Sequence, residues 1–515
     1  MKRIFIFLTA FIFLLGIISG CASMKTSKKQ FSGINKKLEI RDFAGAISQI
    51  ESSKDKFYKE KEKVLYYLDI GMLYHYNREY KKSNEFLEKA EFAIEELYTK
   101  SISKAAVSLL LNDNAMDYSG EDYEDIYLNV FKALNYLELD KFDEAFVEIR
   151  RINNKLSVLE DKHVKMANQF NLSKDKTNEF KTGKSKFHNS ALGRYLSLIL
   201  YRAEGKMDDA RIDMNKIRDS WELQKHICDF EIPEMDNYLN RTDKARIDIL
   251  SFIGKSPDKK AKTLYIHTET DVLIIATTKE APDGTKKSVG DTGELVDATV
   301  EMVDLTKDFA NSVIDIIPFK PKKKKKEEAK IEEDKIEATL DIINWPGVQK
   351  GYHFKFQLPY MDMRKSQVAK IKVFVDDKLK LELEPIESVE NVALETYKVK
   401  EPLIYLKTIT RSVVKGLLSE KAKVEMEKQT GGGYLGLASR LATDVAVDAT
   451  ENADLRISRF FPAKALIGEI EVEPGIHNIK VEYYSKKGTL LFIDDIGEKE
   501  ISKSGLNLIE SFYLD

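Results

Sequence analysis

Apolar side chains recur at helical spacing from residue 31 to residue 222, with few glycine or proline interruptions, and this pattern most constrains the fold. It is clearest in residues 67–90, YLDIGMLYHYNREYKKSNEFLEKA. Gly71 and Ser83 are small residues on the facing sides of two helices, and large apolar residues surround them. Small residues let two helix backbones approach closely. The pattern therefore predicts a helix hairpin at residues 67–90.

The same template recurs along this part of the chain. Weaker copies occupy residues 129–152 and 195–214, and a partial copy occupies residues 41–50. The loops NREYKKS, ELDKFDEA and AEGKMDDA are predicted to be one kind of turn. Residues 67–90 resemble a tetratricopeptide repeat, and the irregular spacing indicates insertions between units. Such repeats stack and expose a concave surface that usually holds a peptide or another protein. The alternative is a helical bundle without a ligand.

The pattern changes to strand signals near residue 263, so we expect an α+β multidomain chain: an all-α, TPR-like repeat domain followed by a mixed domain that ends in a β-hairpin or sheet. The expected divisions are a signal peptide at 1–20, a lipidated tether at 21–30, repeats at 31–222, a connecting helical segment at 223–262 and the α+β domain at 263–515. Within the connecting segment a helix is expected over 235–253, and within the α+β domain a charged linker is expected at 318–336.

Within the second half, strands are expected around 263–279, 338–343, 352–358 and 369–383, and helices around 295–317, 386–428 and 434–453. A hairpin is expected to turn at Asp376–Asp377. The last 50 residues are expected to be strands, with tight turns at Pro474–Gly475 and Lys487–Gly488.

The first 21 residues predict export and lipidation. A basic start is followed by a short apolar run and then by Ile18–Ser19–Gly20–Cys21, which resembles a bacterial lipobox. The Cys21 thiol would accept a diacylglycerol, so the mature chain would be anchored to a membrane rather than span it. The absence of an acidic residue after Cys21 favours the outer membrane facing the periplasm. The alternative is an uncleaved N-terminal anchor.

The overall charge is nearly balanced, with 82 Lys and Arg against 85 Asp and Glu. A net charge of −3 argues against a nucleic-acid-binding protein, which usually carries a basic excess. With Cys21 lipidated, Cys228 is the one remaining cysteine and has no disulfide partner. No later stretch is apolar and long enough to span a membrane.

Residues 449–484 resemble the C-terminal signature of an uncharacterised family of bacterial lipoproteins. The residues that match are Ala453, Asp454, Arg456, Arg459, Pro462, Ala463, Pro474, Gly475 and His477. Two further elements of that family resemble Tyr118, Gly120, Glu121, Tyr123 and Glu124, and Glu148, Arg150 and Arg151. The resemblance implies an envelope lipoprotein without an established activity; some members are encoded beside lipoprotein activators of peptidoglycan synthases. The strand–Pro–Gly–strand end looks like the PEGA-type hairpins of envelope proteins.

The sequence contains no metal-binding or cofactor-binding motif. Two Gly-Lys-Ser triplets, at 183 and 254, lack the upstream glycine of a phosphate-binding loop, because those positions hold Asn178 and Ile249. The best polar constellation is Asp444, Asp448, Glu451 and Asp454 with Arg456 and Arg459. Paired carboxylates there would suit a hydrolase, and an ion-pair network is the alternative. Similarly, Glu148, Arg150 and Arg151 would bind a partner's carboxylate or join repeat helices.

The leading hypothesis is a non-enzymatic, lipid-anchored envelope scaffold whose repeats hold a protein or peptide partner. It has no cofactor, no nucleic-acid partner and no evident small-molecule substrate. The alternatives are a hydrolase of an envelope polymer such as peptidoglycan, and a regulator of a peptidoglycan synthase or export complex. Besides Cys21, the candidate partner-binding or structural residues are Tyr74, Tyr118, Glu121, Glu124, Glu148, Arg150, Arg151, Asp454, Arg456 and Arg459.

Overall fold

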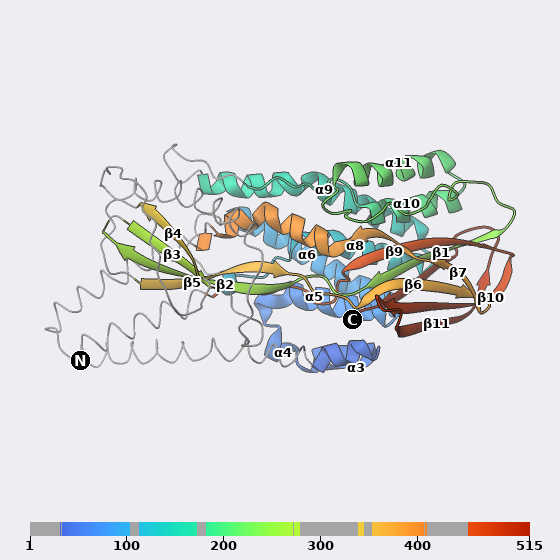
Figure 1. Ribbon diagram of the computed structural model, residues 1–515, viewed down its shortest axis with the longest axis horizontal. Coiled ribbons are helices and arrows are strands. Elements are labelled where there is room, and N and C mark those ends of the chain that lie inside the picture. Colours follow the sequence, from blue (N-terminus) through green and yellow to red (C-terminus); the bar gives the residue numbers. More distant parts are fainter. Residues whose placement is uncertain are drawn as a thin grey trace.

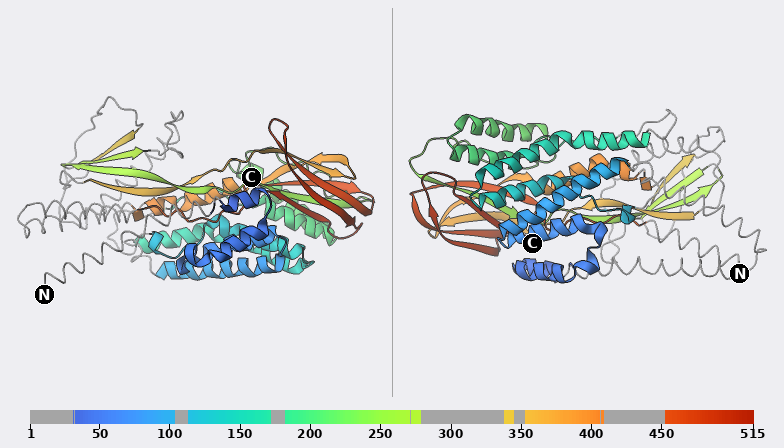
Figure 2. Two further views of the ribbon diagram at one scale, coloured as in Figure 1. Left: turned by 90° about the horizontal axis from the view of Figure 1, so that it is seen from below. Right: turned by 180° about the vertical axis from the view of Figure 1, so that it is seen from behind.

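Among the residues that the structure describes, helices predominate up to residue 223 and strands after it. The computed structural model describes residues 31, 33–103, 113–171, 182–270, 272–278, 338–344, 353–405, 407–408 and 452–515. In this part the α+β layout expected from the sequence is confirmed. Figure 1 and Figure 2 show the helices stacked along one side of the strands.

The helices of the first half are α3 (Phe43–Ser52), α4 (Lys54–Phe57), α5 (Lys63–Tyr76), α6 (Tyr80–Ser103), α8 (Asp122–Leu137), α9 (Phe142–Asn171), α10 (Ala191–Ala203) and α11 (Met207–Leu223), with short 3₁₀ turns η1 (Glu60–Glu62) and η2 (Asp113–Ala115). Residues 33–39 are also helical and precede α3, and a further helix covers 389–405.

One kind of turn joins four successive helix pairs. At each turn a residue adopts a positive φ: Arg41 (56°), Arg78 (60°), Asp140 (56°) and Gly205 (76°). The amide of the next residue donates to a carbonyl five residues back: Asp42 to Lys37 (2.7 Å), Glu79 to Tyr74 (2.9 Å), Lys141 to Tyr136 (2.8 Å) and Lys206 to Tyr201 (2.8 Å). This is the Schellman motif, which satisfies the last helical carbonyls. The predicted similarity of the turns is therefore confirmed.

The close approach predicted at residues 67–90 lies between α5 and α6. The Ser83 hydroxyl donates to the Gly71 carbonyl at 2.8 Å. A Cβ atom added to Gly71 would lie 2.8 Å from a methyl carbon of Leu87, closer than real Cβ contacts allow. Only glycine therefore permits this spacing of the two helices.

The strands are β1 (Ala245–Ile253), β2 (Asp258–Glu269), β3 (Val272–Thr278), β4 (Ala338–Asn344), β5 (His353–Asp362), β6 (Val368–Val375), β7 (Lys378–Glu382), β8 (Glu384–Ser388), β9 (Lys464–Val472), β10 (Gly475–Ser485), β11 (Leu490–Ile501) and β12 (Leu508–Tyr513). They form three four-stranded sheets with the orders β12-β1-β9-β8, β11-β10-β6-β7 and β4-β3-β2-β5. The pairs are antiparallel except β1 with β12, which is parallel.

The first sheet is buried on both faces. Along β1, Ile247 and Ile249 belong to a core shared with β6 and β10, whereas Leu250 and Phe252 belong to a core shared with the helices. Helices, first sheet and second sheet therefore form three successive layers, because side chains alternate across a strand. The third sheet carries β3 and β4 at the opposite end of the molecule from β10 and β11 (Figure 1).

The helix predicted over residues 235–253 is wrong, because Ala245–Ile253 is strand β1. A strand buried on both faces has a near-continuous apolar run, which a helical pattern resembles. The helix predicted to begin at 386 begins at 389, after β8. The hydrophobic core that contains Phe31 also contains Leu514, so both halves of the chain contribute to it.

Of the predicted turns, those at Asp376–Asp377 and Lys487–Gly488 are confirmed, and both Asp residues have positive φ (52° and 58°). The hairpin expected at Pro474–Gly475 is wrong: β9 and β10 follow one another but lie in different sheets. Residues 1–30, the predicted helix at 295–317 and the charged linker at 318–336 lie outside the described residues. The predicted helix at 434–453 lies outside them as far as residue 451, and residues 452–453 are not helical.

Candidate functional site

Residues 452–463, which carry the Asp454, Arg456 and Arg459 motif, have no regular secondary structure and lie against the helices. The Tyr76 hydroxyl of α5 donates to the Phe460 carbonyl at 2.9 Å. The Phe461 ring lies 6.0 Å from the Phe131 ring of α8, and both side chains are fully buried. The segment therefore covers the inner face of the helix pairs, where the sequence predicted an open surface for a partner.

Two buried carboxylates hold this segment through Ser458. Asp69 of α5 accepts a hydrogen bond from the Ser458 hydroxyl (2.8 Å), and Glu124 of α8 accepts one from the Ser458 amide (2.6 Å). Burial raises the pKa of Asp69 to about 6. Burial, together with the charge of Glu121, raises the pKa of Glu124 to about 7. The segment is therefore fixed to the helices by acids that bind protons more readily than free carboxyls do.

Tyr118 and Glu121 complete this cluster at the start of α8. The Tyr118 hydroxyl donates to Glu124 at 2.7 Å, and the Glu121 amide donates to the same oxygen at 2.7 Å. Glu121 caps α8 and forms ion pairs with Lys259 and Lys400. Its charge is thus neutralised by residues from the second half of the chain.

The motif arginines bind across the same junction. Arg456 pairs with Asp454 at 2.8 Å and donates to the carbonyls of Asp113 (2.8 Å) and Met116 (3.0 Å). Arg459 pairs with Asp258 of β2 at 3.1 Å. Asp454, Arg456 and Arg459 are therefore occupied by contacts within the chain.

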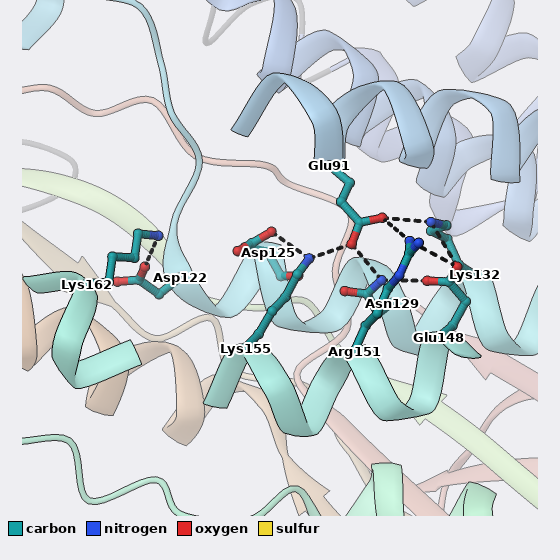
Figure 3. Close-up of polar contacts among 9 residues, drawn as sticks. All are labelled: Glu91, Asp122, Asp125, Asn129, Lys132, Glu148, Arg151, Lys155 and Lys162. Carbon is teal, nitrogen blue, oxygen red and sulfur yellow. Dashed lines mark hydrogen bonds and ion pairs between the residues drawn. The ribbon is translucent and has the colours of Figure 1, made fainter. Parts of the chain in front are cut away.

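A second cluster of charged side chains lies between α6, α8 and α9 (Figure 3). Glu91 of α6 accepts from Lys132 of α8 (2.7 Å) and from Arg151 and Lys155 of α9 (2.9 and 2.8 Å). Glu148 of α9 pairs with Lys132 at 3.1 Å. Figure 3 shows these side chains directed toward one another from three helices.

The charges of the second cluster compensate each other. Burial alone would raise the pKa of Glu91, but the charges of Lys155 and Lys132 outweigh it and hold the pKa at about 2. Burial alone would raise the pKa of Asp122, at the start of α8, but the charge of Lys162 and the contacts with His163 outweigh it and hold this pKa well below the usual range. Because every carboxylate here faces a cation, the cluster joins helices and leaves no charge for a ligand.

The structure divides the candidate residues among four places. Tyr118, Glu121, Glu124, Asp454, Arg456 and Arg459 meet at the junction with residues 452–463, and Glu148 and Arg151 join the second cluster. Tyr74 lies apart: its hydroxyl donates to Glu51 at 2.8 Å and its ring stacks on Phe86. Arg150 is exposed on α9. Asp444, Asp448 and Glu451 lie outside the described residues, as does Cys21.

Sequence reasoning missed Asp69, Glu91, Lys132 and Glu387, all of which are buried and join separate elements. Glu387 of β8 accepts from the Tyr127 hydroxyl of α8 and from the Ser190 hydroxyl at 2.9 Å. A signal was present for two of them, because Asp69 and Lys132 interrupt otherwise apolar helical segments. A charge at such a position must find a partner when it is buried.

The described residues contain no group of three or more His, Cys, Asp and Glu side chains arranged to hold a metal ion. Among the described helices, none combines the length and the hydropathy of a membrane-spanning segment. Comparison with protein families, with curated proteins and with solved structures finds no match to this chain.

Proposed function

We propose that this chain is a non-enzymatic, lipid-anchored scaffold protein of the bacterial cell envelope. The observation that carries the proposal is the set of helix hairpins joined by one repeated turn, with Gly71 and Ser83 at the close approach of the first full unit. This arrangement supports TPR-like repeats, whose usual role is to bind another protein.

The partner surface would be the outer side of the second helices in each pair. The first helices, α5, α8 and α10, are buried along most of their length against the rest of the chain. On the second helices, Phe92 of α6, Val158 of α9 and Ile212 of α11 are each more than half exposed. Exposed apolar side chains on a rigid helical layer favour contact with a protein.

Attachment to the envelope rests on the sequence of residues 1–21. The lipobox at Ile18–Cys21 would place a lipid on Cys21, ten residues before the first described residue, Phe31. The chain would then be held at the outer membrane and face the periplasm.

The polar clusters support a structural role over an enzymatic one. The junction carboxylates Asp69 and Glu124 accept hydrogen bonds from the chain itself, and Glu91 and Glu148 face cations from neighbouring helices. The hydrolase alternative depends on Asp448 and Glu451, and no described contact favours it.

The test is photo-crosslinking in cells, with a crosslinking amino acid at Phe92, at Val158 or, as a matched control, at Ile476 of β10, which is also well exposed. We expect the two helical positions to capture the same envelope protein and Ile476 not to capture it. The Cys21→Ala chain should lose that product. Equal capture at Ile476, or none at either helical position, would contradict the proposal.

The identity of the captured protein distinguishes the variants of the proposal. A peptidoglycan synthase or an export component would make the chain a regulator of that machine. Hydrolysis of peptidoglycan by the purified chain, lost in Asp448→Asn or Glu451→Gln, would instead establish the enzyme.

A further inference from the structure

His75, near the end of α5, is a buried histidine whose two ring nitrogens each face an oxygen atom from another element. Its side chain is 0% exposed. Nδ1 lies 2.7 Å from Oδ1 of Asn135 in α8, and Nε2 lies 2.8 Å from Oε1 of Glu510 in β12. The ring therefore bridges the helices and strand β12.

The neighbours of Asn135 fix the direction of its amide group. The Ser83 hydroxyl donates its one proton to the Gly71 carbonyl at 2.8 Å, so it can only accept from Asn135. The Nδ2 atom of Asn135 lies 2.8 Å from this hydroxyl and donates to it. The Oδ1 atom of Asn135 is therefore the atom directed at His75, and Nδ1 of His75 must carry the proton between them.

Both ring nitrogens of His75 thus need a proton, because the Glu510 carboxylate also accepts and does not donate. A ring with both protons is an imidazolium cation. The Glu510 side chain is 6% exposed, and among the described residues no other cation lies within ion-pair distance of it. His75 and Glu510 therefore form a buried ion pair that joins α5 to β12.

Other charged or titratable groups lie around this pair. They are Glu138 at the end of α8, Tyr80 of α6, Arg78 in the turn before α6 and Lys499 of β11. Glu138 adds a negative charge near the ring, but its side chain is exposed and solvent screens it. Burial raises the pKa of Tyr80, so this residue stays neutral. Glu510 is thus the main charge that acts on His75.

We propose that the His75–Glu510 pair is a pH-sensitive latch that holds strand β12 against the helices. When the ring loses a proton, one of its nitrogens presents a lone pair to an oxygen atom, and Glu510 stays buried without a cation. β12 is an edge strand of its sheet and pairs there with β1 alone. It is therefore the element that a weakened latch would loosen first, together with the packing of Phe512 on Tyr76.

The direction of the pH dependence follows from the same contacts. Burial would lower the pKa of His75, but the charge of Glu510 and the hydrogen bonds to Glu510 and Asn135 outweigh it and raise this pKa above its ordinary value of 6.5. The folded state then binds the proton more tightly than the unfolded state does. The contribution of the pair is complete below pH 6.5, and it is lost as the pH rises through the raised pKa.

The first test is hydrogen–deuterium exchange of the full chain in non-ionic detergent from pH 6 to pH 9, with rates corrected for the intrinsic effect of pH on exchange. We expect residues 508–513 to lose protection as the pH rises, and to lose more of it than β10 does. In Glu510→Gln, which keeps an acceptor but removes the charge, this loss should occur at lower pH. His477→Gln is the matched control, because His477 also contacts a carboxylate, that of Asp376, but in another sheet. It should leave the profile of residues 508–513 unchanged.

The second test reads the ring itself, in a chain with ¹⁵N-labelled histidine. The His75→Gln variant identifies the His75 signal among those of the seven histidines. At pH 6 both ring nitrogens of His75 should carry protons in the folded wild type, and one should lose its proton at higher pH. A neutral His75 ring at pH 6 would overturn the proposal. So would a profile of residues 508–513 that is the same in Glu510→Gln as in the wild type.

Discussion

Lys132 shows how single residues organise this molecule. It is 1% exposed and is neutralised by Glu91 and Glu148, which belong to two other helices. The sequence predicts that Glu148, Arg150 and Arg151 either bind a partner's carboxylate or join repeat helices. It did not indicate Glu91, since no local spacing relates it to Lys132. The pairings of buried charges thus depend on which helices become neighbours.

Replacing Lys132 with methionine should destabilise the protein by about 3 kcal/mol, because two buried carboxylates lose a shared cation. Urea unfolding at neutral pH measures the change. In the control Lys216→Met, an exposed ion pair with Asp219 is lost, and the free energy of unfolding should change by less than about 0.5 kcal/mol. Equal effects of the two substitutions would show that the buried cluster contributes nothing specific.

The junction carboxylates predict a pH dependence. Glu124 has a pKa of about 7 in the folded protein against 4.5 for a free glutamate, so the folded state binds its proton more tightly. The contribution of Glu124 to the free energy of unfolding is therefore largest below pH 4.5, and it is lost as the pH rises to about 7. Asp69, Glu387 and Glu469 have raised pKa values and act in the same direction.

We expect the free energy of unfolding to fall between pH 5 and pH 8, with about 2 kcal/mol of the fall due to Glu124. Urea midpoints across this range should decline less steeply for Glu124→Gln than for the wild type. The exposed residue Glu85 provides the control, and Glu85→Gln should leave the slope unchanged. A wild-type midpoint that rises with pH would contradict the assignment.

At the scale of elements, local chemistry predicted the helix hairpins better than the strands. The turns near Arg78, Asp140 and Gly205, and the small residues at the helix contact, are local signals that the structure confirms. The sequence predicts a helix where strand β1 lies, because a strand that is buried on both faces has an apolar pattern similar to that of a helix. It predicts a hairpin at Pro474–Gly475, whereas β9 and β10 pair with distant strands in two different sheets. The spacing of apolar residues shows which face of a helix or strand is buried, but it does not show which other element packs against that face.

Gly71→Ala should lower the free energy of unfolding by about 1 kcal/mol or more. The new methyl group would overlap Leu87, which outweighs the better helix propensity of alanine. Gly33→Ala is the control: its Cβ meets only the flexible end of Gln49, so we expect no loss or a small gain. Thermal unfolding checks this difference: the unfolding temperature should fall for Gly71→Ala and should stay the same or rise slightly for Gly33→Ala.

At the scale of the whole molecule, the helices and the first sheet depend on one another. Phe131 of α8 packs on Phe252 of β1 and on Phe461, and Tyr76 of α5 packs on Phe512 of β12. Arg202 of α10 binds both carboxylate oxygens of Asp248 in β1 at 2.7 Å. The sequence did not predict this dependence, because repeats of this kind can present an open inner face.

The helical part alone, residues 31–223, should therefore fail to fold as a stable monomer, since Tyr76, Tyr123 and Phe131 would lose their cover. Sedimentation velocity and near-ultraviolet circular dichroism should show association and loss of fixed aromatic packing, with the full chain as the reference. A monomeric fragment that unfolds cooperatively would contradict this expectation.

The parallel pairing of β1 with β12 affects how the protein is made. β12 is the last strand of the described chain, and the helices that it helps to cover are synthesised first. A nascent chain therefore emerges with an apolar helical face that stays uncovered until β12 has been synthesised, which makes it a client for holding chaperones. Translation that stopped before residues 508–513 would release a product marked for proteolysis.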